Sequence, residues 1–168
     1  STSQIAADEW IDQAKDLEHV MFAGCTHPPA VNLAERLIQL LPSGLTRVFY
    51  SDNGSTAVEV AVKLACQYWR NKGQPQRHHI LALEHAYHGD TAGAMSVSAE
   101  SVFTAAFTPL LFSVARAHAP YCSRCPLGLT REMCDVDCLQ SLEAQLEQQA
   151  ETTAAVIIEP MLQGAGGM

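Results

Sequence analysis

One short run restricts the fold of this chain more than any other part of its sequence. Residues 154–158 (AAVII) are all apolar, and Glu159 and Pro160 follow them directly. A strand without polar alternation is typical of a parallel sheet that helices cover on both faces. Because helical and extended segments alternate along the rest of the chain, we predict an α/β fold with a mostly parallel sheet.

Apolar spacing and turn residues predict the elements of this fold. Helices are predicted where apolar residues recur three or four positions apart, at residues 6–17, 30–41, 58–69, 90–97 and 138–150. Runs rich in β-formers predict two strands besides 154–158, at residues 47–51 (RVFYS) and 79–84 (HILALE).

Composition and charge narrow the class of protein. The 168 residues are 48% hydrophobic and 17% charged, which is typical of about one globular domain. The net charge of −8 argues against nucleic acid or an anionic membrane surface as partner. No apolar run reaches the length of a membrane span, and the first residues carry no signal-peptide pattern, so we expect a cytoplasmic protein.

The segment SDNGST, residues 51–56, is the first candidate binding motif. It joins a predicted strand to a predicted helix, and Gly54 allows the backbone to turn tightly and to approach a ligand. Ser55 and Thr56 add hydroxyls beside free N–H groups, and Thr56 and Glu59 fit the capping-box pattern. Such a helix start favours a phosphate or another anion, although an ordinary capped turn without a ligand fits the same residues.

The segment EHAYHGDT, residues 84–91, is the second motif. It follows a predicted strand, and ligands of α/β sheets bind at the carboxyl ends of strands. The ring of Tyr87 can stack on a flat cofactor, and His88 can donate a hydrogen bond or move a proton. The alternative is a turn whose aromatic side chains cover the sheet edge.

The segment IIEPMLQGAGG, residues 157–167, is the third motif. Glu159 ends a buried strand, so its carboxylate should be paired or functional. The alternative is that this carboxylate only caps a neighbouring loop.

Four of the six cysteines lie in one turn-rich loop. They are Cys122, Cys125, Cys134 and Cys138. Two close pairs can form a tetrahedral thiolate zinc site, but the spacing between the pairs is shorter than in common zinc ribbons. We therefore predict reduced or redox-sensitive thiols and no obligatory metal.

Taken together, the motifs resemble one family. HVMFAGCTHPPA, DNGSTAVEVAVKLACQYW, AYHGDTAGAMSV and IIEPMLQGAGGM stand in this order, as they do in class III aminotransferases, which use pyridoxal 5'-phosphate (PLP). The resemblance covers the chain from about Glu18 onward. It implies that residues 1–168 are part of the large cofactor domain of a fold-type I PLP-dependent transferase, and we expect this part to be truncated at both ends.

The resemblance also implies roles for single residues. Gly54 and Ser55 match the phosphate-binding pair of the family. Tyr87 matches the aromatic residue that stacks on the pyridine ring and faces the substrate, and His88 completes its turn. Glu159 matches a strand-end glutamate near the cofactor.

The catalytic groups of the family have no counterpart here. Its Schiff-base lysine and its pyridine-pairing aspartate lie beyond Met168, so no catalytic residue is assigned in this segment. Lys15, Lys63 and Lys72 are the only lysines, and each stands in a helical or polar context rather than after a strand. We therefore expect these 168 residues alone to be catalytically silent, and the family implies a homodimer for the intact protein.

The resemblance implies a particular amino transfer. QYW after the phosphate-binding helix and GAMSV after YHGDT fit the biotin-pathway member better than ornithine or GABA transaminases. The implied donor is S-adenosylmethionine, or lysine as in some relatives, and the implied acceptor is 8-amino-7-oxononanoate. A diamine or ω-amino acid transaminase and a non-catalytic truncated fragment remain as alternatives.

Overall fold

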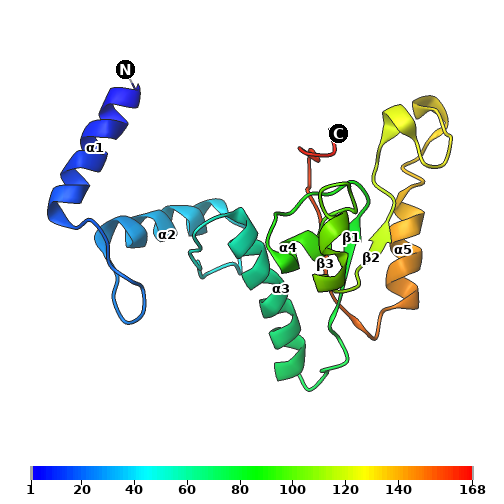
Figure 1. Ribbon diagram of the computed structural model, residues 1–168, viewed down its shortest axis with the longest axis horizontal. Coiled ribbons are helices and arrows are strands. Elements are labelled where there is room, and N and C mark those ends of the chain that lie inside the picture. Colours follow the sequence, from blue (N-terminus) through cyan, green and yellow to red (C-terminus); the bar gives the residue numbers. More distant parts are fainter. Residues whose placement is uncertain (1, 168) are drawn as a thin grey trace. The chain divides into compact units, whose positions relative to one another are not determined.

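The structure is a computed structural model that describes residues 2–167, and Figure 1 shows its elements in chain order. Within these residues, no helix combines the length and the apolar character that crossing a bilayer requires. The elements are α1 Thr2–Asp16, α2 Pro28–Leu40, α3 Gly54–Asn71, β1 His79–Leu83, α4 Ala92–Val97, η1 Ala105–Leu110, β2 Ala115–Ala117, η2 Cys122–Arg124, η3 Arg131–Met133, α5 Leu139–Gln148 and β3 Thr153–Ile157.

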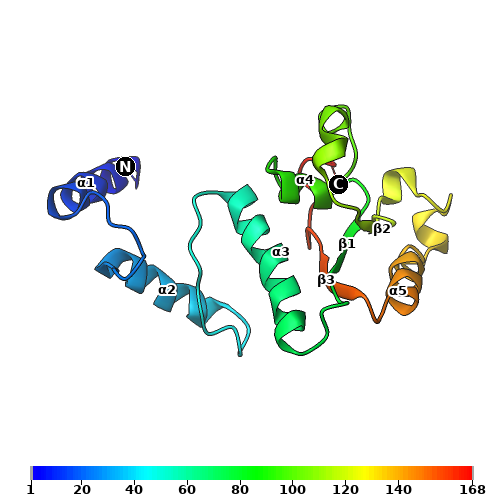
Figure 2. The same ribbon diagram turned by 60° about the horizontal axis from the view of Figure 1, so that its bottom comes forward.

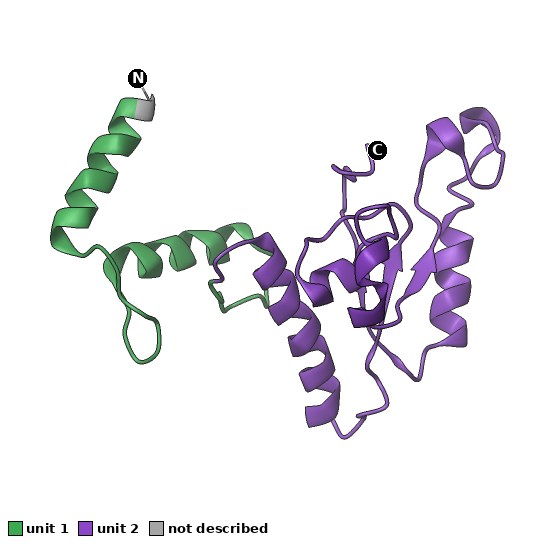
Figure 3. Ribbon diagram, viewed as in Figure 1, with its two compact units in different colours: residues 1–50 green, residues 51–168 purple. Residues whose placement is uncertain are grey.

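The chain divides into two compact units, residues 1–50 and 51–168, which Figure 3 colours separately. The first unit holds α1 and α2. Proline fits the first turn of α2, because an N–H at that position has no partner within the helix. His27 caps this turn by accepting the N–H of Ala30. The hydroxyl of Tyr50 donates to the Ala30 carbonyl at 2.6 Å, which ties the end of the unit to its second helix.

The second unit is built on a three-stranded parallel sheet in the order β2-β1-β3. The central strand β1 pairs Leu81 with Ala115 of β2 and with Val156 of β3. Both views show α3 and α5 on opposite sides of these strands (Figure 2). The prediction of an α/β fold with a parallel sheet is confirmed.

The core of the second unit lies around β1, because this strand has a neighbour on each side. Leu81 and Ala82 are almost completely buried, and Val97 of α4 and Ala117 of β2 have no exposed surface. Burial of these apolar side chains is the main favourable contribution to folding. It fixes β1, and with it the loop that follows β1.

One predicted strand is wrong. Residues 45–51 carry no helix or strand, although the run RVFYS favours extended backbone. A strand needs a partner for its backbone hydrogen bonds, and the strands of the described chain pair only with one another. Phe49 is 72% exposed, so burial does not hold the segment in a sheet either.

Two burial expectations need correction. The strand β3 is an edge of the sheet, and Val156 is 39% exposed rather than buried on both faces. Apolar spacing in the predicted helix 138–150 places Leu139 on the inward face. The helix exists as α5, but Leu139 in its first turn is 50% exposed, and the neighbouring Cys138 is buried instead.

Candidate cofactor-binding site

A cleft of about 430 Å³ opens between the first turn of α3 and the loop that follows β1. Because the strands are parallel, the loop after β1 and the segment after β3 leave the sheet at the same edge. The cleft is lined by Asn53, Gly54, Ser55, Val58, Tyr87, His88 and Gly89. Four of the five residues assigned to the cofactor from sequence therefore line one cavity.

The start of α3 is capped by Asn53. Its side chain accepts the Thr56 N–H at 3.0 Å, and the Thr56 hydroxyl accepts the Asn53 N–H at 3.1 Å. The capping box therefore joins Asn53 and Thr56, and the expected pairing of Thr56 with Glu59 is wrong. The reason is that Gly54 and Ser55 are already helical, which moves the cap to the residue before them.

This cap leaves donors free at the mouth of the cleft. The N–H groups of Gly54 and Ser55 are in the first turn, where a helix offers no carbonyl, and neither donates elsewhere in the described chain. The Ser55 hydroxyl accepts the Asp90 N–H at 3.1 Å and keeps its own proton for a ligand. The Thr56 hydroxyl, in contrast, is occupied by the cap.

Gly89 allows the loop after β1 to approach α3 closely. Its φ of +132° lies in a region that residues with a side chain rarely adopt. A Cβ at this position would lie 2.9 Å from the Cα of Ser55. Only glycine therefore permits the contact that brings Tyr87 next to the start of α3.

Tyr87 offers a ring surface to the cleft. The side chain is 46% exposed, and its hydroxyl donates to Oδ2 of Asp90 at 2.6 Å. This hydrogen bond, with smaller contributions from burial and the Asp90 charge, raises the pKa of Tyr87. The hydroxyl is therefore protonated and oriented at neutral pH.

His88 points into the protein. Its backbone N–H donates to the Ser98 hydroxyl at 2.8 Å. Its ring Nε2 is buried without a hydrogen-bond partner in the described chain. Burial lowers the pKa of His88, Glu159 opposes this shift and Arg116 adds to it. The imidazole is therefore neutral at physiological pH, with one nitrogen left unpaired beside the cleft.

Glu159 lies behind the cleft rather than in its lining. Its Oε1 accepts the Tyr87 N–H at 3.0 Å, and its Oε2 accepts the Gly164 N–H at 2.9 Å. The carboxylate is thus paired, as expected for a strand-end charge, and it joins the loop after β1 to the loop after β3.

The structure adds residues that sequence reasoning missed. Asp90 orients Tyr87 and contacts Ser55, and its place in the YHGDT motif was a usable signal. Ser98 holds the backbone of His88, and Glu59 binds the start of α4; neither had a sequence pattern pointing to this role.

The described residues that line this cleft include no lysine and no cysteine. Lys15, Lys63 and Lys72 are all exposed, and none lines the cleft. Within residues 2–167, no group of three or more His, Cys, Asp or Glu side chains is arranged to hold a metal ion. Burial, together with nearby thiols, raises the pKa of Cys138.

A parallel α/β sheet whose cleft joins a helix start with free N–H groups to an exposed tyrosine is an arrangement that suits a flat, phosphorylated cofactor. Residues 7–168 match the family described as aminotransferase class-III, and the chain belongs to this family. The resemblance stated from the motifs is thereby confirmed.

Several curated relatives of the chain share a name. The adenosylmethionine-8-amino-7-oxononanoate aminotransferase of Geobacter sulfurreducens is 50% identical over 157 residues, which are 93% of this chain and 35% of that protein. The chain spans about a third of the length of the curated relatives that it matches.

Solved structures of aminotransferases share the fold. The enzyme of the same name from Methanocaldococcus jannaschii gives a TM-score of 0.85 at 35% identity, over 96% of this chain and 34% of that one. An amine transaminase from an uncultivated Pseudomonas species, solved with PLP bound, gives a TM-score of 0.85 at 36% identity. The match covers 94% of this chain and 36% of that one.

Proposed function

We propose that this chain supplies the PLP-binding part of an adenosylmethionine-8-amino-7-oxononanoate aminotransferase of biotin synthesis. The whole protein would transfer an amino group from S-adenosylmethionine to 8-amino-7-oxononanoate and form 7,8-diaminononanoate. The observation that carries this proposal is the cleft between α3 and Tyr87 in a chain 50% identical to a relative of that name.

The start of α3 is the proposed phosphate site. The free N–H groups of Gly54 and Ser55 and the Ser55 hydroxyl all lie at one end of the cleft. The positive end of the helix dipole adds an attraction for a phosphate dianion. An added Cβ at Gly54 would have no atom of residues 2–167 within 4 Å, so among these residues the space beside it is free for a ligand.

The ring of Tyr87 is the proposed stacking surface for the pyridine ring. It lies across the cleft from Gly54, and Asp90 and Glu159 hold its hydroxyl and its N–H. When bound, PLP supplies an electron sink for breaking bonds at the amino carbon. The chain's own contribution is to bind the phosphate, to fix the ring plane and to offer the Tyr87 hydroxyl to the substrate.

His88, which lines the cleft, and Glu159, which lies behind it, are proposed to support the cofactor. A neutral His88 adds no charge beside the pyridine ring, and its unpaired Nε2 can accept or donate one hydrogen bond there. Glu159 keeps the loops after β1 and β3 together at the cleft.

The remaining properties are proposed from the family. The lysine that carries the cofactor and the aspartate that pairs with the pyridine nitrogen are assigned to other parts of the protein, since Lys15, Lys63 and Lys72 all lie outside the cleft. We propose a cytoplasmic homodimer that acts on small molecules, without a membrane or nucleic-acid partner.

A second candidate function is transfer from another amine. The likeness to the Pseudomonas amine transaminase, at a TM-score of 0.85, favours it. The cleft residues described above belong to the cofactor part of the site, so they fit either substrate class.

The test is an assay of the full-length protein that contains this chain. Purified protein with PLP would be given 8-amino-7-oxononanoate and, in separate reactions, S-adenosylmethionine, lysine or a simple aryl-alkyl amine. We expect 7,8-diaminononanoate with one of the first two donors. Turnover of the amine only, with no product from 8-amino-7-oxononanoate, would support the second candidate instead.

A further inference from the structure

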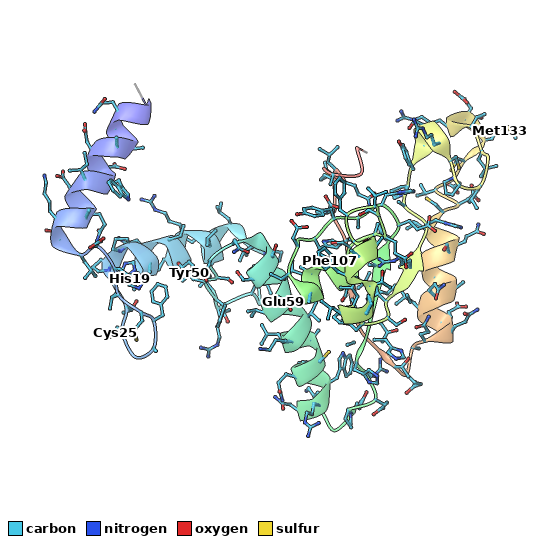
Figure 4. The ribbon with its side chains drawn as sticks, in the orientation of Figure 1. His19, Cys25, Tyr50, Glu59, Phe107 and Met133 are labelled. Atoms are coloured by element: carbon cyan, nitrogen blue, oxygen red, sulfur yellow. The ribbon has the colours of Figure 1, made fainter. Side chains whose placement is uncertain are left out.

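The carboxylate of Glu59 joins α3 to the start of α4. It lies one turn after Ser55 and is half-buried, on the side of α3 next to α4 (Figure 4). Its Oε1 accepts three hydrogen bonds, from the Thr91 hydroxyl at 2.6 Å, from the Gly93 N–H at 2.7 Å and from the Ala94 N–H at 3.2 Å.

These donors belong to the start of α4, which has no cap of its own. Thr91 is the residue before the helix, and its side chain makes no cap hydrogen bond to the helix. The carboxylate of Glu59, which belongs to α3, therefore acts as the cap of α4. The hydrogen bond from Thr91, and then those from Gly93 and Ala94, lower the pKa of Glu59 against the opposing effect of burial, so the group is a carboxylate at neutral pH.

A second contact holds the other end of the same loop. The Ser55 hydroxyl accepts the Asp90 N–H, and Gly89 packs against the Ser55 backbone. Ser55 and Glu59 are four positions apart, so they lie on the same face of α3. The segment from Gly89 to Ala94 is thus attached to this face at two points, directly after Tyr87.

We propose that Glu59 is a positioning residue of the cofactor cleft, whose carboxylate holds the start of α4 against α3 and so sets the distance between Tyr87 and the phosphate-binding turn. The inference rests on the proposed function, because it assigns Glu59 a role toward the cofactor that binds there. Glu59 does not line the cleft itself, so its effect passes through the loop after β1.

Gly93 gives an independent way to break the same contact. A Cβ at Gly93 would lie 2.7 Å from Cδ of Glu59, so an alanine there would displace the carboxylate without altering its charge. Because the three hydrogen bonds hold this side chain in place, the displacement is expected to disturb all of them.

The experiment compares Glu59→Gln and Gly93→Ala with the unsubstituted full-length protein. Glu143→Gln on the exposed face of α5 is the matched control. PLP is removed from each protein and titrated back, and three properties are measured: the Kd for PLP, the visible circular dichroism of bound PLP and the Tm of the cofactor-free protein.

We expect both variants to raise the Kd for PLP by about tenfold, which corresponds to losing one charged hydrogen bond. The circular dichroism of bound PLP should change because the ring contact with Tyr87 shifts. The double variant should raise the Kd for PLP little more than either single variant, because both substitutions break the same contact. Glu143→Gln should leave all three properties unchanged.

Thr91→Val and Thr91→Ser give a milder pair if Glu59→Gln does not fold. Valine removes the hydroxyl that donates to Glu59, and serine keeps it, so only serine should retain the PLP dichroism. If the variants lower only the Tm of the cofactor-free protein, and leave Kd and dichroism at the control values, Glu59 is merely structural and the inference is wrong. Failure of the unsubstituted protein to bind PLP would instead overturn the proposed function.

Discussion

In the proposed function, the ring and the hydroxyl of Tyr87 have separate tasks. The exposed ring faces the cleft, while the hydroxyl is bound to Asp90 at 2.6 Å. Stacking depends on the ring face, and the hydrogen bond with Asp90 depends on the oxygen alone. The two tasks can therefore be removed one at a time.

Replacing Tyr87 by phenylalanine should leave the Kd for PLP within about threefold of the original value, because the ring remains and only one hydrogen bond is lost. Replacing it by alanine should raise the Kd by about tenfold or more, since stacking is lost. Titration of the cofactor-free full-length protein with PLP measures both. Equal effects of the two changes would contradict stacking on the cofactor.

Gly54 is the residue at which a side chain should interfere with phosphate. Gly54→Val puts a branched side chain at the first turn of α3, where the added Cβ has no atom of the described residues within 4 Å. We expect the Kd for PLP to rise by at least about tenfold with little change in folding. Ala61→Val, at an exposed position of the same helix, is the control for the cost of valine in a helix. An unchanged Kd in Gly54→Val would contradict the assignment of the phosphate site.

At the scale of the elements, local sequence patterns predicted those helices and strands whose formation depends mainly on their own residues. The helices α2 and α3 and the strands β1 and β3 lie where periodicity put them, because each has a continuous apolar face or run. Residues 47–51 show where such reasoning stops: the run favours strand, but strand formation depends on a partner elsewhere in the chain.

The cap of α3 gives a prediction for this element. Asn53→Ala removes the acceptor for the Thr56 N–H and should lower the free energy of unfolding by about 1 kcal/mol. Asn32→Ala, at an exposed position within α2, removes no helix cap and should lower the free energy of unfolding less. Urea denaturation followed by circular dichroism compares the two, and equal losses would mean that the Asn53 cap contributes nothing.

The cysteine-rich loop carries the prediction that no metal is obligatory. Burial and neighbouring thiols raise the pKa of Cys138, so without a metal this group is a thiol at neutral pH. Elemental analysis of protein purified without chelators should give far less than one zinc per chain. About one zinc per chain, lost when all four cysteines are replaced by serine, would contradict the prediction.

At the scale of the whole molecule, the motifs selected residues that the structure brings close together, but they did not predict what each residue contacts. The motifs placed Gly54, Ser55, Tyr87 and His88 at strand and helix ends, and the structure brings them to one cleft. The pairing of Glu159 with the Tyr87 N–H spans 72 residues, and it depends on the register of β1 with β3, which no local pattern encodes.

The burial of His88 makes the stability of the folded protein depend on pH. Its pKa is lowered from 6.5, so below about pH 6.5 the unfolded chain binds a proton that the folded chain does not. The free energy of unfolding should therefore decrease as the pH falls from about 6.5 to the folded pKa. His88→Gln should weaken this decrease, whereas His19→Gln at an exposed position should not. Urea denaturation at about pH 7.5 and about pH 5.5 measures it, and identical slopes in all three proteins would contradict the assignment.

The long span between Tyr87 and Glu159 also sets an order of events during synthesis. The chain leaves the ribosome with its N-terminus first, so α3 and the loop after β1 emerge well before β3 and can fold before it. Ser55 and Glu59 can hold Asp90 and Thr91 at that stage, since these contacts span only 32 to 35 residues. The Tyr87 N–H acquires its partner Glu159 only when β3 has paired with β1, so a nascent chain can form the turn at Gly54 and Ser55 before the backbone of Tyr87 is fixed.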